Sequence, residues 1–198
     1  MNYLAHSALS GTVSSFTIGN FIADHVRGRD LSHFPVDIAL GIQFHRSIDQ
    51  FFDNHHQVKL LRAQFPDGFR RYSGIILDMW FDHLLAINWD SFYSVTLSEF
   101  QTQVSKALRQ NIDVIPDSQK RFVDYFHQER LFEKYKRRQD IARNITLMAS
   151  RLKKPQHLID CFTFFMEHPI GVSKVFERVY REMMQKAEQH NPTNLQVV

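Results

Sequence analysis

Apolar residues recur at spacings of three or four along most of this 198-residue chain, which is the period of an amphipathic helix. Ser14 and Ser15 can cap a helix that runs to Gly28, and Pro35 suits the first turn of the next helix. Long stretches lack the Gly and Pro clusters that bound short strands, so the pattern predicts an all-α fold. Further helices are expected over residues 72–89, 97–111, 117–135, 138–152 and 155–188.

One of these helices carries charged side chains on a face that is otherwise apolar. In the helix that begins near residue 35, His45 and Asp49 lie on the stripe formed by Ile38, Ile42 and Phe52. Seven of the 11 histidines fall within the first 83 residues. Buried carboxylates and imidazoles are costly unless they are paired or bound to a metal, so this pattern indicates a functional site.

The helix predicted over residues 72–89 is apolar nearly all round, which is typical of a buried helix, yet it contains Asp78, Asp82 and His83. Asp78 and Asp82 lie about 40° apart on one face, and His83 lies about 100° further round. We expect this polar face to meet His45 and Asp49 in a common cavity. The alternative is a buried ion-pair network in which arginines supply the positive charge, namely Arg46, Arg27 or Arg71.

Composition and charge narrow the classes of protein. The chain is 43% hydrophobic, which supports one domain over residues 1–190, and residues 191–198 are expected to form a frayed tail. A single cysteine, Cys161, excludes a disulfide framework and a cysteine-rich zinc site. No signal peptide and no apolar run of about 18 residues is present, which predicts a cytoplasmic protein without a membrane partner. A net charge of +3 indicates no nucleic-acid partner but permits an acidic protein partner.

The donor types favour a metal site. Imidazoles and carboxylates without a thiolate suit Mn²⁺, Mg²⁺, Fe²⁺ or a catalytic Zn²⁺. Such an ion lowers the pKa of bound water and neutralises charge on a phosphoryl oxygen. Arg46 lies between His45 and Asp49, where a guanidinium could bind two phosphate oxygens. The chain has no Gly-rich phosphate loop, no GxSxG elbow and no CxxC pair, so nucleotide-loop, serine-hydrolase and thiol chemistry lack support.

Five segments in order along the chain resemble the acyl carrier protein phosphodiesterase family: MNYLAH, GNFIADHVRG, GIQFHRSIDQFFD, LDMWFDHLLA and MASR. The resemblance implies an all-helical, HD-domain-like bundle, distantly similar to the HD-domain metal phosphohydrolases. It also implies an enzyme that removes 4′-phosphopantetheine from holo-acyl carrier protein to give the apo protein. The family depends on a divalent metal, typically Mn²⁺.

The resemblance also suggests roles for residues in these segments. Asp24 in GNFIAD is the first candidate for metal binding and catalysis, and His83 or His6 would protonate the leaving oxygen while Arg46 stabilises the developing charge. HD-domain enzymes carry adjacent His-Asp in that order, whereas this chain has Asp82 followed by His83. The assignments therefore rest on the family's own segments. The implied metal ligands are Asp24, His45, Asp49, Asp78, Asp82 and His83.

Basic residues would hold the acidic carrier protein, which is the expected partner and substrate. Arg27 and Arg71 are close in sequence to the predicted site, and Lys153 and Lys154 are more distant. Two alternatives stay open on the residues alone. The chain could be an HD-like metal phosphohydrolase that acts on a nucleotide, or a metal-free helical adaptor for an acidic protein.

Overall fold

The computed structural model describes residues 2–168 and 170–190, and every regular element in these ranges is helical. The prediction of an all-α fold is confirmed for this part of the chain. It contains α1 (Tyr3–Leu9), α2 (Ser15–Ile22), α3 (Val36–Asn54), α4 (His56–Ala63), α5 (Arg70–Ile87), α6 (Leu97–Gln110), α7 (Asp117–Glu129), α8 (Leu131–Lys134), α9 (Arg138–Ala149), α10 (Pro155–Glu167) and α11 (Val172–His190). Three short 3₁₀ helices, η1 (Ala23–His25), η2 (Trp89–Ser91) and η3 (Ile112–Val114), link some of them.

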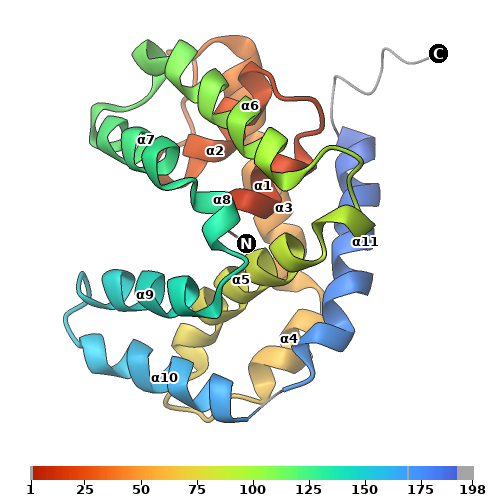
Figure 1. Ribbon diagram of the computed structural model, residues 1–198, viewed down its shortest axis with the longest axis vertical. Helices are drawn as coiled ribbons and strands as arrows, with labels where there is room; N and C mark the ends of the chain where they lie inside the picture. The colour runs from red at the N-terminus through yellow and green to blue at the C-terminus, as the bar shows by residue number, and fades with distance from the viewer. Residues whose placement is uncertain (1, 169, 191–198) are drawn as a thin grey trace.

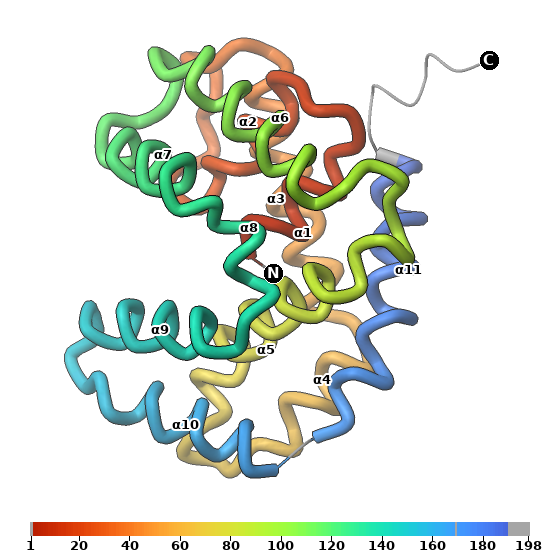
Figure 2. Tube along the Cα trace, in the orientation of Figure 1, coloured from red at the N-terminus to blue at the C-terminus, as the bar shows by residue number. Residues whose placement is uncertain are grey.

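Helix α5 forms the centre of the molecule. It packs against α1, α4, α9, α10 and α11, and most of its residues are buried, as its nearly uniform apolar pattern predicts. Helices α2, α6 and α7 gather at one end of the molecule and α9 and α10 at the other, while α11 runs along one flank (Figure 1). The chain trace shows α1 between these two groups (Figure 2).

Three predicted helices differ from the observed ones. The helix expected to reach Gly28 ends at Ile22 and continues only as η1, so Asp24 lies on a 3₁₀ turn. The helix expected over residues 117–135 breaks at Arg130, which adopts a left-handed φ of 47°. The helix expected over 155–188 is interrupted between α10 and α11, where Gly171 has a φ of 72°. Helices α1 and α4 were not predicted. The tail expected over residues 191–198 lies outside the described residues.

The backbones of α2 and α3 approach each other closely at two glycines. An added Cβ at Gly19 would lie 2.1 Å from the Ile38 carbonyl oxygen, and one at Gly41 would lie 2.1 Å from the Phe16 carbonyl oxygen. Only a residue without a Cβ fits at either position. This contact brings Asn20 on α2 next to His45 on α3 and so sets the geometry described below.

None of the described helices is long and apolar enough to cross a membrane. Cys161 is buried in α10, as expected for a small apolar residue, and its Sγ lies 3.7 Å from the Phe69 carbonyl oxygen.

Candidate metal centre

His6, His45 and Asp49 form a compact cluster between α1 and α3. One ligand atom of each lies within 4.8 Å of the others, and no other such group of His, Cys, Asp or Glu occurs among the described residues. His6 Nε2 lies 2.9 Å from Asp49 Oδ1, and His45 Nε2 lies 3.1 Å from Asp49 Oδ2. The two imidazole rings stack with centroids 3.7 Å apart. Three groups that can each donate a lone pair to a metal therefore converge on one point.

Asn20 fixes the orientation of the His45 ring. His45 Nδ1 lies 2.8 Å from the Asn20 carbonyl oxygen, which can only accept, so Nδ1 carries the hydrogen and donates it. The Asn20 amide in turn donates to the His6 carbonyl oxygen at 2.6 Å and to Ser10 Oγ at 2.8 Å. The Nε2 lone pair of neutral His45 is then free to bind a metal, which is the usual arrangement of a metal-ligating histidine.

Asp24 completes the cluster from η1. Its Oδ1 lies 3.1 Å from His45 Nε2, and 54% of its side chain is exposed. Asp24 therefore faces solvent while it contacts the buried histidine. The sequence predicted His6, Asp24, His45 and Asp49 as site residues, and the structure brings these four together. Asn20 was not predicted, although an asparagine in an apolar helix, four residues before Asp24, is a signal that could have identified it.

The charges of the cluster depend on its hydrogen bonds. Burial opposes protonation of His45, but the hydrogen bonds to Asp24 and Asp49 outweigh this effect and raise the pKa of His45 to about 9. Burial and the adjacent His45 lower the pKa of His6 to about 4. Burial favours the neutral form of Asp49, but its hydrogen bonds to His45 and His6 outweigh this and hold the pKa of Asp49 well below its usual range. At neutral pH the metal-free cluster contains one imidazolium and two carboxylates.

These residues fit a divalent cation in two respects. His6 Nε2 faces Asp49 and could bind a metal once its hydrogen moves to the buried Nδ1, which has no hydrogen-bond partner. A dication in place of the His45 proton would also balance the charges of Asp24 and Asp49. Metal binding would then release a proton, as is usual for imidazole ligands.

Ligand pockets in proteins commonly have volumes of about 300–1,000 Å³. Asp24 lines a pocket of about 610 Å³. We call it the α7–α9 pocket, because α7 and α9 supply much of its wall. Asp24 and His25 lie at its edge, and Tyr3 Oη lies 3.1 Å from His25 Nε2. Its apolar lining includes Phe122, Tyr125, Leu131, Leu147 and Met148, and two arginines, Arg121 and Arg151, also line it.

Asp82 and His83 were expected to meet His45 and Asp49, but their described contacts are with other parts of the chain. Asp82 is fully buried, and its carboxylate accepts the backbone N–H of Leu4 at 2.8 Å and of Ala5 at 3.1 Å. His83 Nδ1 donates to the Tyr135 carbonyl oxygen at 2.7 Å, and its ring packs against Trp80. His45 and Asp49 thus lie together in the cluster, whereas the described contacts of Asp82 and His83 are with α1 and with Tyr135. Asp82 holds the start of α1, and His83 joins α5 to the residue after α8.

Asp78 and Arg46 affect the surroundings of the cluster in different ways. Burial raises the pKa of Asp78, and repulsion from Asp49 and Asp53 adds to this effect. Arg46 Nη2 donates to the Val26 carbonyl oxygen at 3.0 Å. This hydrogen bond ties α3 to the segment that follows η1 and so helps to position Asp24.

The predicted docking residues are exposed but scattered. Arg27 follows η1 near Asp24, and Lys153 and Lys154 precede α10, close in sequence to Arg151 of the α7–α9 pocket. The Arg71 guanidinium packs over the Tyr72 ring at 4.5 Å, and none of its described contacts reaches the cluster. The two arginines of the pocket, Arg121 and Arg151, were not predicted.

Replacing Asp82 with alanine should lower the free energy of unfolding by about 2–4 kcal/mol, because two buried N–H groups at the start of α1 lose their acceptors. Urea denaturation would measure this loss. Asp90, which is exposed in η2, provides the matched control and should cost less than about 0.5 kcal/mol. Equal stability of the two variants would contradict this role of Asp82.

Comparison with known proteins agrees with the resemblance noted in the sequence. A model of the acyl carrier protein phosphodiesterase family matches residues 1–183. A Klebsiella pneumoniae protein with that name is 37% identical over 192 residues, which cover 95% of this chain and 98% of that protein. A Yersinia pestis protein of the same name is 34% identical, with the same coverage of each chain. No solved structure matches.

These matches place the all-helical chain in a class of phosphodiesterases. The chain belongs to the acyl carrier protein phosphodiesterase family.

Proposed function

We propose that this protein hydrolyses the phosphodiester that joins 4′-phosphopantetheine to a serine of acyl carrier protein, with a divalent metal held by His6, His45 and Asp49. The family match over residues 1–183 carries the choice of reaction and substrate. The cluster of two histidines and a carboxylate supports the metal. Asp24, 3.1 Å from His45, is a fourth donor on the open side of the cluster.

Mn²⁺ is the ion that we propose, because the resemblance to the acyl carrier protein phosphodiesterase family implies it. The donors, imidazoles and carboxylates without sulfur, also suit Mg²⁺, Fe²⁺ and Zn²⁺. A bound dication would supply activated water and would neutralise charge on the phosphoryl oxygens. The protein's own part is to hold the ligands: Asn20 orients His45, and Arg46 holds the segment that follows Asp24. Asp78 is coupled to the cluster by charge, because repulsion from Asp49 helps to raise its pKa.

The leaving serine oxygen needs a proton, and we assign its transfer to His25. This histidine is adjacent to Asp24 and lies at the edge of the α7–α9 pocket, next to the cluster. Its Nε2 hydrogen-bonds to Tyr3 Oη, which orients the ring, and the exposed imidazole can exchange its proton with solvent. His6, with a pKa of about 4, is a weak proton carrier at neutral pH, and His83 is bonded to Tyr135 instead.

The α7–α9 pocket is the proposed site for the phosphopantetheine arm. The phosphodiester would lie at Asp24, and the arm would extend along Phe122, Leu131 and Met148. A volume of about 610 Å³ is within the range of small-molecule sites. Arg121 and Arg151 line the same pocket, so the acidic carrier protein would dock around it, with Arg27, Lys153 and Lys154 as more distant contacts.

Filling this pocket should separate two substrates. We expect Met148→Trp to lower kcat/KM for holo-acyl carrier protein at least about tenfold, because the indole takes the volume that the arm needs. Hydrolysis of bis(p-nitrophenyl) phosphate, which has no arm, should change less than about twofold. Thr146→Trp, on the exposed side of the same helix, is the matched control. Equal losses on both substrates would place the arm elsewhere.

An evolutionary relation to the HD-domain phosphohydrolases is part of the proposal. The support is a histidine–carboxylate cluster held between helices, although the order Asp82–His83 differs from the HD pair and Asp82 caps α1. The nucleotide hydrolase and the metal-free adaptor are the competing functions, and the experiment below distinguishes them.

The experiment that tests the function is incubation of the protein with holo-acyl carrier protein and Mn²⁺, followed by mass spectrometry of the carrier. The proposal predicts loss of the phosphopantetheine arm and appearance of the apo mass. Parallel incubations with nucleoside monophosphates and cyclic nucleotides test the nucleotide alternative. An unchanged carrier mass with binding of the carrier would favour the adaptor instead.

A further inference from the structure

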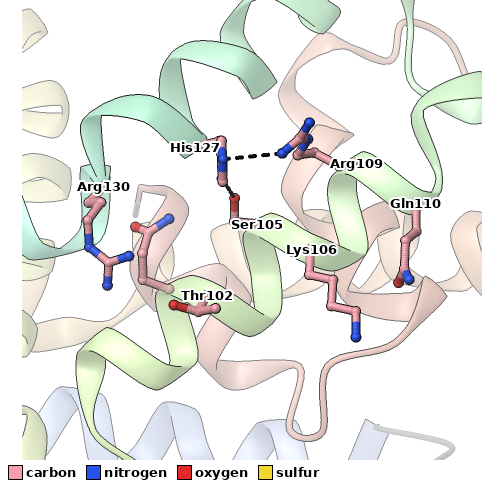
Figure 3. A pocket seen from close by; sticks show the side chains of 8 residues that line it. Thr102, Ser105, Lys106, Arg109, Gln110, His127 and Arg130 are labelled. Atoms are coloured by element: carbon pink, nitrogen blue, oxygen red, sulfur yellow. Dashed lines mark hydrogen bonds between the residues drawn. The ribbon is translucent and has the colours of Figure 1, made fainter.

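A second pocket, of about 420 Å³, lies between α6 and the C-terminal end of α7 (Figure 3). We call it the α6–α7 pocket. It shares no lining residue with the metal cluster or with the α7–α9 pocket. The function proposed above does not use it.

Positive charge surrounds the mouth of this pocket. Lys106, Arg109 and Arg130 line it, and none of the described lining residues is Asp or Glu. Arg130 is neutralised by an ion pair with Glu133 and also donates to Ser98. Lys106 has no ion pair with a described residue, and Arg109 contacts only a neutral partner, His127. Two uncompensated cations therefore face the pocket.

The hydrogen bonds of His127 make Ser105 a donor toward the pocket. The Arg109 guanidinium can only donate, so His127 Nε2, 3.2 Å away, accepts and is unprotonated. His127 Nδ1 must then carry the hydrogen and donate it to Ser105 Oγ at 2.7 Å. Figure 3 shows His127 with one dashed line to Arg109 and another to Ser105. The Ser105 hydroxyl keeps its own hydrogen free to donate, and His127 does not act as a base toward it.

Gln101 adds an unused donor at the buried end of the pocket. This residue is 1% exposed, and its Oε1 accepts the Phe132 backbone N–H at 2.8 Å. That bond fixes the amide so that Nε2 carries the two hydrogens, and Nε2 has no hydrogen-bond partner. A buried amide donor without a partner is costly, and an acceptor in the pocket would remove this cost.

We propose that the α6–α7 pocket binds a dianionic phosphate, either free or as the monoester of a small molecule. Gln101 and Ser105 supply neutral donors from the buried side, and Lys106 and Arg109 supply two positive charges at the mouth. Two free cations match a dianion better than they match a monoanionic diester. Arginine and lysine together with neutral donors are the usual ligands of phosphate oxygens. The volume also leaves room for an organic group beside the phosphate.

Titration of the chelated, ¹⁵N-labelled protein with inorganic phosphate, followed by NMR, tests this site away from any bound metal. We expect saturable shifts of amides in α6 and at the end of α7, and none of this size with sodium chloride at equal ionic strength. Ribose 5-phosphate is the second probe. Tighter binding of ribose 5-phosphate would identify a monoester site, and equal or weaker binding would identify a site for free phosphate.

Variants decide whether the named residues form the site. Lys106→Gln and Arg109→Gln should each raise the Kd for inorganic phosphate about tenfold, while Lys174→Gln on exposed α11 should leave it unchanged. Gln101→Glu keeps the acceptor for Phe132 but replaces the free donor with a charge, so it should abolish binding. Shifts that do not saturate, or a Kd that is unaffected by Lys106→Gln and Arg109→Gln, would overturn the proposal.

Discussion

Replacement of His45 by alanine is expected to reduce hydrolysis of holo-acyl carrier protein more than about 100-fold. Loss of groups that only support metal ligands typically costs 10–100-fold, and His45 is a proposed ligand itself. Its Nε2 contacts both Asp24 and Asp49, so its removal also separates the two carboxylates from their shared partner. The variant should lose bound metal in parallel with activity.

The comparison for His45→Ala is His33→Ala, which removes an exposed histidine outside the cluster. It should keep turnover within about twofold of the unsubstituted protein. Circular dichroism and urea denaturation would establish that both variants fold. Turnover of His45→Ala within about tenfold of the original value, with metal still bound, would mean that the catalytic ligands lie elsewhere.

The second large effect is expected at Gly41. A Cβ at this position would lie 2.1 Å from the Phe16 carbonyl oxygen, and backbone atoms cannot move aside as a flexible side chain can. Helices α2 and α3 would have to separate, so Gly41→Ala should lower the free energy of unfolding by about 3 kcal/mol. The gain in helix propensity from glycine to alanine, about 1 kcal/mol, is smaller than this clash.

Gly68→Ala is the control for this prediction, because nothing lies within 4 Å of an added Cβ there. It should leave the free energy of unfolding unchanged or slightly higher. Gly41→Ala should also weaken metal binding, since the same contact holds Asn20 against His45. A Gly41→Ala variant as stable as Gly68→Ala would contradict the close approach of the two helices.

Periodicity predicted the main helices because long apolar stripes depend on local sequence. The stripe with His45 and Asp49 and the nearly uniform apolar helix at Asp82 both correspond to observed elements. Breaks that tertiary contacts determine were not predicted. Arg130 adopts a left-handed conformation without a nearby Gly or Pro, and its side chain bonds to Ser98 of α6, which is distant in sequence.

The site was predicted only in part, because periodicity depends on local sequence and does not show contacts between helices. Helical spacing placed His45 and Asp49 on one face, but it could not show what Asp82 meets. Asp82 accepts N–H groups from α1, a helix of seven residues that was too short to predict. His6 became a site residue through the resemblance alone. The asparagine in an apolar helix marks Asn20 as unusual, but spacing does not show that its backbone carbonyl accepts a hydrogen bond from His45.

Binding of Mn²⁺ to the chelated protein, measured by electron paramagnetic resonance, tests the central claim most directly. The claim is that His6, His45 and Asp49 hold the metal and that Asp82 does not. Asp49→Asn should therefore raise the Kd for Mn²⁺ at least about tenfold, because it removes a charged ligand but keeps the shape of the side chain. Asp82→Asn, where folded, should bind Mn²⁺ like the unsubstituted protein. Unchanged binding in Asp49→Asn together with lost binding in folded Asp82→Asn would contradict the account.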